Sequence, residues 1–226
     1  MTTIECKDLV KDIKGVRVID KINLTMSSGK ITGFKGINGS GKTMLMRLIA
    51  GLITPTSGSV IINDKVLSKD ITFPPSVGIL IENPAFLDTY SGFDNLKILA
   101  SIKGGINKEK IDETISSVGL DPNDTKKYRK YSLGMKQRLG IAAAIFESPD
   151  IIVLDEPTNA LDSSGVEILK SLLVKEKERG ALIIVSCHDL TILQELSDEI
   201  YVLEAGKVVE YIPMKKGDKM YESKEG

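Results

Sequence analysis

The segment from Gly36 to Thr43, which reads GINGSGKT, constrains the fold of this chain more than any other stretch. It fits the pattern G-x-x-x-x-G-K-S/T and lies between an expected strand at 30–34 and an expected helix at 43–50. Glycines let successive backbone N–H groups turn toward an anion, and the positive end of the following helix points to the same place. The pattern therefore predicts a phosphate-binding loop in an α/β protein.

Two side chains of this loop have expected tasks of their own. Lys42 is expected to reach the β- and γ-phosphates of a nucleoside triphosphate, and the hydroxyl of Thr43 is expected to hold Mg²⁺. A flexible glycine loop that fits the pattern by accident is the alternative, and the flanking strand and helix argue against it. The residues expected to contact the nucleotide are Asn38, Gly39, Ser40, Gly41, Lys42, Thr43 and Met44.

Apolar strands alternate with helical patterns in the second half of the chain. Fully apolar runs at 151–154 and 181–185 are separated by an amphipathic stretch at 163–180, and a further helix is expected at 190–200. Such alternation is typical of a parallel sheet that is covered on both faces. At 91–147, apolar residues recur instead at helical spacing. We therefore expect an α/β fold with a mostly parallel sheet and a helical lobe.

Composition excludes several classes of function. The chain has 30 Lys+Arg and 31 Asp+Glu and a net charge of −1, which gives no electrostatic reason to expect nucleic acid or a membrane surface as a partner. No stretch reaches the roughly 18 apolar residues of a spanning helix, and the first residues are too charged for a signal peptide, so we expect a cytosolic chain. Cys6 and Cys187 are expected to be reduced, buried thiols rather than a disulfide or zinc site.

Two acids follow the apolar strand at 151–154. In an open α/β sheet the carboxyl ends of the strands face the ligand crevice, so both acids are expected near the phosphates. Asp155 is suited to bind Mg²⁺, and Glu156 is suited to accept a proton from an attacking water. The alternative, a strand that simply runs into a solvated turn, would need no particular acid, and the phosphate-binding loop upstream makes it the weaker reading.

Together with two more motifs, the phosphate-binding loop and the two acids make the chain resemble the nucleotide-binding subunit of ABC transporters, from about residue 2 to 210. YSLGMKQRL at 131–139 is similar to the LSGGQ-type signature of that family, and SCHD at 186–189 is similar to its histidine switch. The segment LDEPTNALD at 154–162 also matches. The resemblance implies that two subunits sandwich two nucleotides head to tail, with each phosphate-binding loop facing the signature of the other subunit.

The resemblance also implies a domain organisation. The whole chain, 1–226, is expected to be one ABC ATPase domain with a P-loop NTPase core and an N-terminal antiparallel β subdomain. The helical lobe is then expected at about 86–147, and a polar tail at about 213–226.

The signature segment offers a hydroxyl at Ser132 and a bare backbone at Gly134, just before an expected helix at 136–146. Together with the positive helix end, these groups suit a phosphate of the partner's nucleotide. Leu133 and Met135 depart from the commoner signature. An N-capped core helix with no further role is the alternative.

His188 is the only histidine of the chain and follows an apolar strand. A lone histidine is ordinarily structural, but this one follows the carboxyl end of a strand and is therefore placed at the ligand crevice. There it is expected to contact the γ-phosphate and to orient Glu156 or the attacking water. The expected catalytic residues are therefore Glu156, His188 and Lys42. Asp162 matches the family's loop between the two sites, and it could also cap the helix that starts near 163.

Two departures from the family's pattern carry information. The family usually has glutamine after the strand VGILI, where it touches Mg²⁺ and the membrane partner, but this chain has Glu82. Glu82 and YSLGMKQ resemble the subgroup that exports lantibiotics and bacitracin-like peptides; chance substitution is the alternative. The aromatic residue that commonly stacks on adenine is missing near Ile13, so Val18 offers only apolar contact and adenine selectivity is expected to be loose.

The sequence thus predicts an ATP-binding and ATP-hydrolysing subunit that powers a separate integral-membrane permease, which is expected to dock near 84–100. ATP and Mg²⁺ are the expected cofactors, with Thr43, Asp155 and Glu82 at the metal. We expect an ATP-dependent homodimer, or a heterodimer with a sister subunit, that is cytoplasmic and held at the inner face of the membrane by the permease. No nucleic-acid partner is expected.

Three other readings stay open. A soluble ABC-type ATPase that acts on ribosomes or nucleic acid usually carries paired cassettes or long helical insertions, which this chain lacks. A small-molecule kinase would lack the signature followed by LDEP. A subunit that binds ATP without hydrolysing it is argued against by the presence of both Glu156 and His188.

Overall fold

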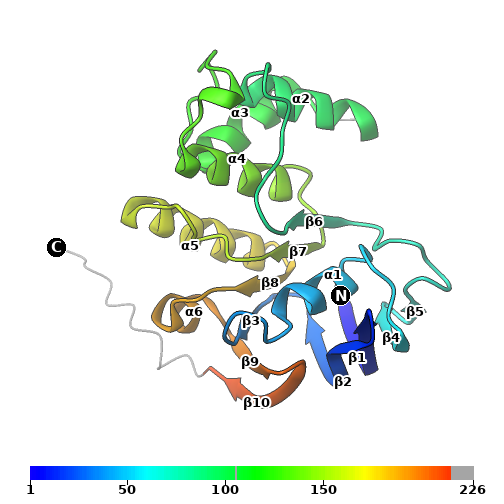
Figure 1. Cartoon of the computed structure of the whole chain (residues 1–226). Coiled ribbons are helices and arrows are strands. Elements are labelled where there is room, and N and C mark those ends of the chain that lie inside the picture. Colours follow the sequence, from blue (N-terminus) through cyan, green and yellow to red (C-terminus); the bar gives the residue numbers. More distant parts are fainter. Residues whose placement is uncertain (105, 215–226) are drawn as a thin grey trace.

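The glycine loop joins a strand to a helix, as the sequence predicts (Figure 1). In this computed structural model, which describes residues 1–104 and 106–214, the strand is β3 (Lys30–Lys35) and the helix is α1 (Lys42–Ile49). One face of α1 is buried through Leu45, Leu48 and their neighbours. Because this face packs on the core, the loop at the start of the helix is held in a fixed place.

A six-stranded sheet runs through the middle of the molecule in the order β10-β9-β3-β8-β7-β6. The pairs β3/β8, β3/β9, β6/β7 and β7/β8 are parallel, and β9/β10 is antiparallel. The predicted mostly parallel sheet is therefore confirmed. Besides β3, its strands are β6 (Val77–Leu80), β7 (Ile151–Leu154), β8 (Leu182–Ser186), β9 (Glu199–Glu204) and β10 (Lys207–Pro213).

A second, antiparallel sheet is built from the N-terminal part of the chain, in the order β2-β1-β4-β5. It packs beside α1 at the lower right of Figure 1 and confirms the expected antiparallel N-terminal unit. Its strands are β1 (Thr3–Ile13), β2 (Val16–Ser27), β4 (Ser57–Ile62) and β5 (Lys65–Val66).

The helical lobe stands on the opposite side of the six-stranded sheet (Figure 1). Each of its α-helices starts at a capping side chain: Ser91, Asn107 and Ser132 accept hydrogen bonds from the backbone of the first turn. The helices of the lobe lie between Gly92 and Ile145. Its helices are α2 (Gly92–Lys103), α3 (Lys108–Ser117), the short 3-10 helix η1 (Tyr128–Lys130) and α4 (Leu133–Ile145).

Some predicted boundaries were wrong. Helix α4 begins at Leu133 rather than at residue 136, because the Ser132 hydroxyl caps it. The helix expected at 190–200 is α6 (Leu190–Leu196), and it ends early because Glu199 lies in β9, where Thr32 donates a hydrogen bond to its buried carboxylate. The β9–β10 hairpin was not predicted from the sequence, and most of the predicted polar tail, 215–226, lies outside the described residues.

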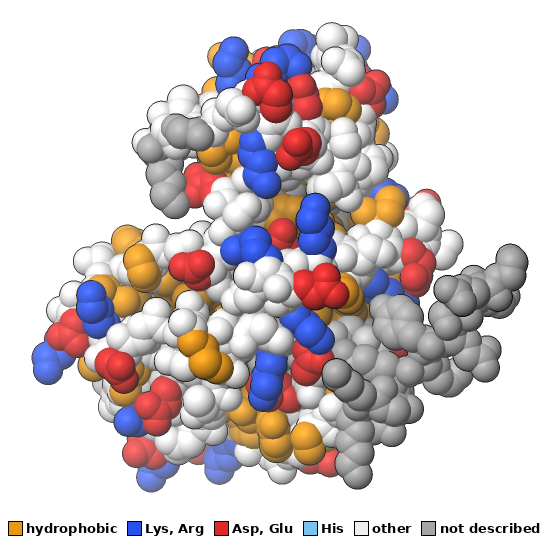
Figure 2. All heavy atoms as spheres, turned by 180° about the vertical axis from the view of Figure 1, so that it is seen from behind, with side chains coloured by type: hydrophobic (Ala, Val, Ile, Leu, Met, Phe, Trp, Pro, Cys, Tyr) orange, Lys and Arg blue, Asp and Glu red, His pale blue; other side chains and the backbone are white. Residues whose placement is uncertain are grey.

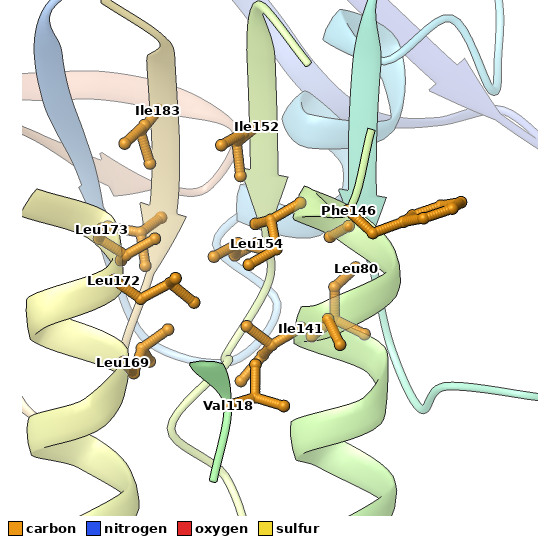
Figure 3. Packing of buried hydrophobic residues seen from close by; sticks show 14 of the residues in the cluster. Leu80, Val118, Ile141, Phe146, Ile152, Leu154, Leu169, Leu172, Leu173 and Ile183 are labelled. Carbon is orange, nitrogen blue, oxygen red and sulfur yellow. The ribbon is translucent and has the colours of Figure 1, made fainter. Parts of the chain in front are cut away.

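Two apolar cores lie on opposite faces of the six-stranded sheet. Residues 152, 154, 183 and 185 face α4, α5 (Ser163–Glu178) and the rest of the lobe, and Figure 3 shows Leu169 and Leu173 of α5 packed against them. Residues 151, 153, 182 and 184 face α1 and the antiparallel sheet. This double burial explains why β7 and residues 182–185 of β8 are apolar at every position.

The two cysteines are free and buried, one in each core, as expected for reduced thiols. Cys6 belongs to the core around α1, and Cys187 belongs to the core under the helical lobe. Over residues 1–104 and 106–214, no helix combines the length and the apolar character that a membrane crossing requires.

Gly78 of β6 allows α4 to lie directly on the sheet. A Cβ atom at this position would overlap the backbone carbonyl of Ala144 in α4. We predict that Gly78→Ala destabilises the chain by about 3 kcal/mol, because neither backbone can move without disturbing the core. Urea-induced unfolding measures this difference.

Gly15→Ala is the control, since Gly15 has φ +81° but open space around it. The control variant should lose about 1 to 2 kcal/mol through backbone strain alone. A Gly78→Ala variant as stable as the wild type would mean that α4 and β6 are not in close contact.

Candidate functional site

The glycine loop forms a nest of backbone N–H groups. Gly39 and Gly41 have φ values of +81° and +108°, and Gly41 is the N-cap of α1, which has no side-chain cap and no acid in its first turn. The first N–H groups of the helix are therefore open toward an anion. A Cβ atom at Gly41 would lie 3.1 Å from the carbonyl oxygen of Val18, so a larger residue would push β2 away.

A cavity of about 280 Å³ opens in front of this nest. Residues from β2, the loop, α1 and the ends of β7 and β8 meet there. The structure thus brings together the predicted nucleotide-contacting residues and the predicted catalytic residues. The lining residues are Val18, Asn38, Gly39, Ser40, Gly41, Lys42, Thr43, Met44, Asp155, Glu156 and His188.

Lys42 is largely buried, and its ammonium group donates hydrogen bonds to the carbonyl oxygens of Gly36 (2.7 Å) and Ile37 (3.3 Å). These are neutral acceptors, so the positive charge of Lys42 stays available to an anion in the cavity. The buried Ser40 Oγ has no hydrogen-bond partner among the described residues. A cation, an unpartnered hydroxyl and open N–H groups around one cavity fit a polyphosphate.

Asp155 links the loop helix to the end of β8. Its Oδ2 accepts a hydrogen bond from Thr43 Oγ1 (2.6 Å), and its Oδ1 accepts one from Ser186 Oγ (2.6 Å). The hydroxyl of Thr43 and the carboxylate of Asp155 are ligands that Mg²⁺ prefers when phosphates and waters complete its shell. No group of three or more His, Cys, Asp or Glu within the described part of the chain could hold a metal by itself. The donor set therefore fits a magnesium ion that arrives with a nucleotide.

Glu156 adopts a left-handed backbone conformation with φ +51°. Its backbone N–H donates to Ser186 Oγ (2.9 Å), and its Oε2 accepts from the backbone N–H of His188 (3.0 Å). Its buried Oε1 lies 3.3 Å from His188 Nε2 and forms no hydrogen bond with any described residue. A strained residue that lines the cavity and has an unpartnered carboxylate oxygen is suited to take a proton.

Burial raises the pKa of the Glu156 carboxyl above its ordinary value of 4.5, and the negative charge of Asp155 acts in the same direction. His188 and Lys42 oppose this rise without cancelling it. A carboxylate with a raised pKa is a stronger base than an ordinary glutamate, so the environment of Glu156 favours proton transfer.

Ser186 was missed by the sequence analysis, although it joins both acids. Its Oγ donates to Asp155 and accepts from the backbone N–H of Glu156, and the residue is fully buried. The available signal was a hydroxyl at the end of an otherwise apolar strand, directly before Cys187 and His188.

Three predicted residues lie outside the cavity. Ser132 caps α4 through its contact with the backbone N–H of Met135 (3.2 Å), and Gly134 of the same helix passes close to the carbonyl oxygen of Ala160. Asp162 caps α5 by accepting from the backbone N–H of Gly165 (3.0 Å). The capping roles of Ser132 and Asp162 are therefore present, and their contacts with a partner's nucleotide stay a prediction.

Glu82 also stands apart from the cavity. Its carboxylate forms an ion pair with Arg47 of α1 (2.5 Å), and its side chain is 63% exposed. This arrangement does not bring Glu82 to Thr43 and Asp155, the two predicted metal ligands that do meet. To reach a metal there, Glu82 would have to leave Arg47.

Comparisons with known proteins agree with this geometry. A family model described as ABC transporter matches residues 19–159. The ABC transporter ATP-binding protein YybJ of Bacillus subtilis, whose function is uncharacterized, is 49% identical over 91% of this chain and 94% of its own length. The bacitracin transport ATP-binding protein BcrA of Enterococcus faecalis is 40% identical over 92% of this chain and 68% of its own length.

Among solved structures, the dimeric structure of MJ0796, a bacterial ABC transporter cassette, superposes with a TM-score of 0.85. The two sequences are 25% identical, and the match covers 94% of this chain and 99% of the other. The fold, the cavity and the relatives confirm the family that the motifs predicted. The chain therefore belongs to the ABC transporter family, in which it is an ATP-binding ATPase subunit.

Proposed function

We propose that this chain hydrolyses Mg·ATP as a dimer, with itself or with a sister subunit, to power a membrane permease that exports bacitracin-like or related antimicrobial peptides. The meeting of Lys42, Thr43, Asp155, Glu156 and His188 around one cavity carries the chemical part of this proposal. The identity to BcrA and the glutamate at position 82 support the peptide cargo.

The backbone N–H groups at the start of α1 bind the phosphates, and Lys42 exchanges its two carbonyl acceptors for phosphate oxygens. Thr43 and Asp155 would hold Mg²⁺, and Ser186 keeps the second oxygen of Asp155 in place. Mg²⁺ held by these two residues would neutralise the developing charge on the phosphates. Val18 contacts the base by apolar surface only, so the site selects the triphosphate more strongly than the base.

Glu156 Oε1 accepts a proton from the water that attacks the γ-phosphorus, and the bond between this phosphorus and the bridging oxygen breaks to give ADP and phosphate. The backbone N–H of His188 holds the other carboxylate oxygen. The imidazole of His188 lies beside Oε1 and orients the carboxylate toward the γ-phosphate.

The permease docks at the groove between the six-stranded sheet and the helical lobe. This groove has a volume of about 300 Å³ and is lined by Leu52, Pro84, Phe86, Gly140 and other residues of both parts. Arg47 also lines it, so the ion pair of Arg47 with Glu82 lies between the groove and the loop helix. The dimer is thereby held at the cytoplasmic face of the membrane.

A nucleic-acid partner is not part of this proposal. Acidic and basic side chains are interspersed on the face seen in Figure 2, and the net charge of the chain is −1. A binding surface for a phosphate backbone would be expected to gather basic residues.

Glu156→Gln tests the hydrolytic step. We predict that this variant binds ATP but hydrolyses it at least about 100-fold more slowly, because the proton acceptor is lost. It should also accumulate as an ATP-bound dimer, which size-exclusion chromatography detects. Glu113→Gln, at an exposed position of α3, is the control and should behave as the wild type. Unchanged phosphate release from Glu156→Gln would contradict the assignment of the base.

The raised pKa of Glu156 also predicts a pH-dependent stability. The folded chain retains the Glu156 proton at pH values at which the unfolded chain has released it, so stability falls as the pH rises from 4.5 to the raised pKa. Without nucleotide, Glu156→Gln should therefore be more stable than the wild type at about pH 7, and this difference should disappear below the ordinary glutamate pKa. Urea unfolding over a pH series measures both; a difference that is constant with pH would contradict the prediction.

The cargo and the membrane partner are tested in the organism that makes the chain. Replacing the gene by the Glu156→Gln allele should increase sensitivity to bacitracin or a related peptide and leave sensitivity to a non-peptide antibiotic unchanged. Affinity purification of the wild-type chain from solubilised membranes should recover an integral-membrane protein. Recovery with ribosomes instead would favour a soluble ATPase.

A further inference from the structure

Helix α4 is tied at two places to the segment that leads from Glu156 to Asp162. The buried Gln137 donates hydrogen bonds from Nε2 to the carbonyl oxygens of Glu156 (3.3 Å) and Pro157 (3.1 Å). The next residue, Arg138, donates from Nη2 to Asp162 Oδ1 (2.9 Å). Two consecutive side chains of one helix therefore hold both ends of this segment.

The surroundings of Arg138 fix its guanidinium in place. Nη1 donates to the carbonyl oxygen of Val118, the C-cap residue of α3, at 2.9 Å. A Cβ atom at Gly119 would lie 2.5 Å from Nη1, and one at Gly165 would lie 2.8 Å from Nη2. Figure 3 shows Val118 in the space between α4 and α5. Glycines from two different elements thus leave room for one planar cation, whose side chain is only 13% exposed.

The carboxylate of Asp162 accepts hydrogen bonds from three donors. Besides Arg138, its Oδ1 accepts from the backbone N–H of Gly165 (3.0 Å), and its Oδ2 accepts from Ser164 Oγ (3.0 Å). The side chain that caps α5 is therefore the one that Arg138 holds. A displacement of α4 must carry Asp162 along or break the ion pair.

We propose that Arg138, together with Gln137, is a positioning residue that couples the two ATP sites of the dimer. Because of these contacts, α4 moves as one unit with the segment from Glu156 to Asp162. This inference rests on the proposed function, in which Ser132 at the start of α4 contacts the nucleotide of the partner subunit. When Ser132 contacts the nucleotide of the partner subunit, α4 shifts the backbone that carries Glu156 in the ATP site of its own subunit.

Neither Gln137 nor Arg138 lines the nucleotide cavity. Loss of Arg138 should therefore leave nucleotide binding to a single subunit unchanged and act on the cooperation between sites. A largely exposed partner such as Asp162 gives an ion pair little stabilising energy, so Asp162→Asn should cost little stability. The coupling role and a purely structural role thus predict different measurements.

The experiment uses the purified full chain with Arg138→Gln. We expect kcat for ATP hydrolysis to fall by about 2- to 30-fold, the range in which residues that couple distant sites act. The Hill coefficient for ATP should fall to about 1, the value for independent sites. Calorimetry with Mg·ADP should give a Kd within about twofold of the wild type, since the cavity is unchanged.

Asp162→Asn provides a second variant, because asparagine caps a helix as well as aspartate but carries no charge for Arg138. Its effects on kcat and on the Hill coefficient should match those of Arg138→Gln, and the double variant should be no worse than either single variant. Lys170→Gln is the matched control. Lys170 is a cation 12% exposed that pairs with Glu167 and Glu195 away from the cavity, and its loss should leave the Hill coefficient unchanged.

The outcomes separate the inference from the function on which it rests. If the wild type hydrolyses ATP cooperatively and Arg138→Gln retains the wild-type Hill coefficient, the coupling role of Arg138 is wrong and the proposed function stands. Additive effects in the double variant, or a wild type that hydrolyses ATP with a Hill coefficient of 1, would also overturn the coupling. A folded wild type that hydrolyses no ATP would instead overturn the proposed function.

Discussion

The carboxylate of Asp155 is the group on which the geometry of the site depends. This carboxylate accepts hydrogen bonds from Thr43 of α1 and from Ser186 of β8. The backbone N–H of Asp155 donates to the carbonyl oxygen of Leu80 in β6. One nearly buried acid therefore fixes the ends of three strands and the start of the loop helix. Its burial is tolerated because both oxygens have donors. Through Ser186, the same contacts also connect the start of the loop helix to Glu156.

Each of the neighbouring strands β6 and β7 is followed, two residues after its end, by a glutamate with a left-handed backbone conformation. Glu82 has φ +64° and Glu156 has φ +51°. This conformation turns the chain sharply out of the sheet, and it is costly for residues with a Cβ atom. The two acids reach different partners: Glu156 meets His188 at the cavity, and Glu82 meets Arg47 beside the groove of the helical lobe. The two strained residues thus lie where the sheet meets the cavity and where it meets the groove of the helical lobe.

What could be predicted from the sequence was local. The glycine loop, the apolar strands and the acids after 151–154 are each defined by neighbouring residues, and the strand ends then place them together. What could not be predicted depends on contacts across the chain. From the sequence alone, Glu199 would be taken for a surface residue, but in the fold Thr32 donates a hydrogen bond to it. Arg138 would be taken for an ordinary helix residue, but its guanidinium contacts Val118 and Asp162. Patterns along one segment carry no information about such partners.

The placement of one thiol in each core gives the chain two internal reporters of its own opening. Burial raises the pKa of Cys6 to about 12 and also raises that of Cys187, so neither is a reactive thiolate in the closed structure. An alkylating reagent can reach Cys6 only when the core around α1 separates, and Cys187 only when the end of β8 beside His188 does. Local opening of the N-terminal sheet and of the sheet edge beside His188 can thus be followed separately in the unmodified protein.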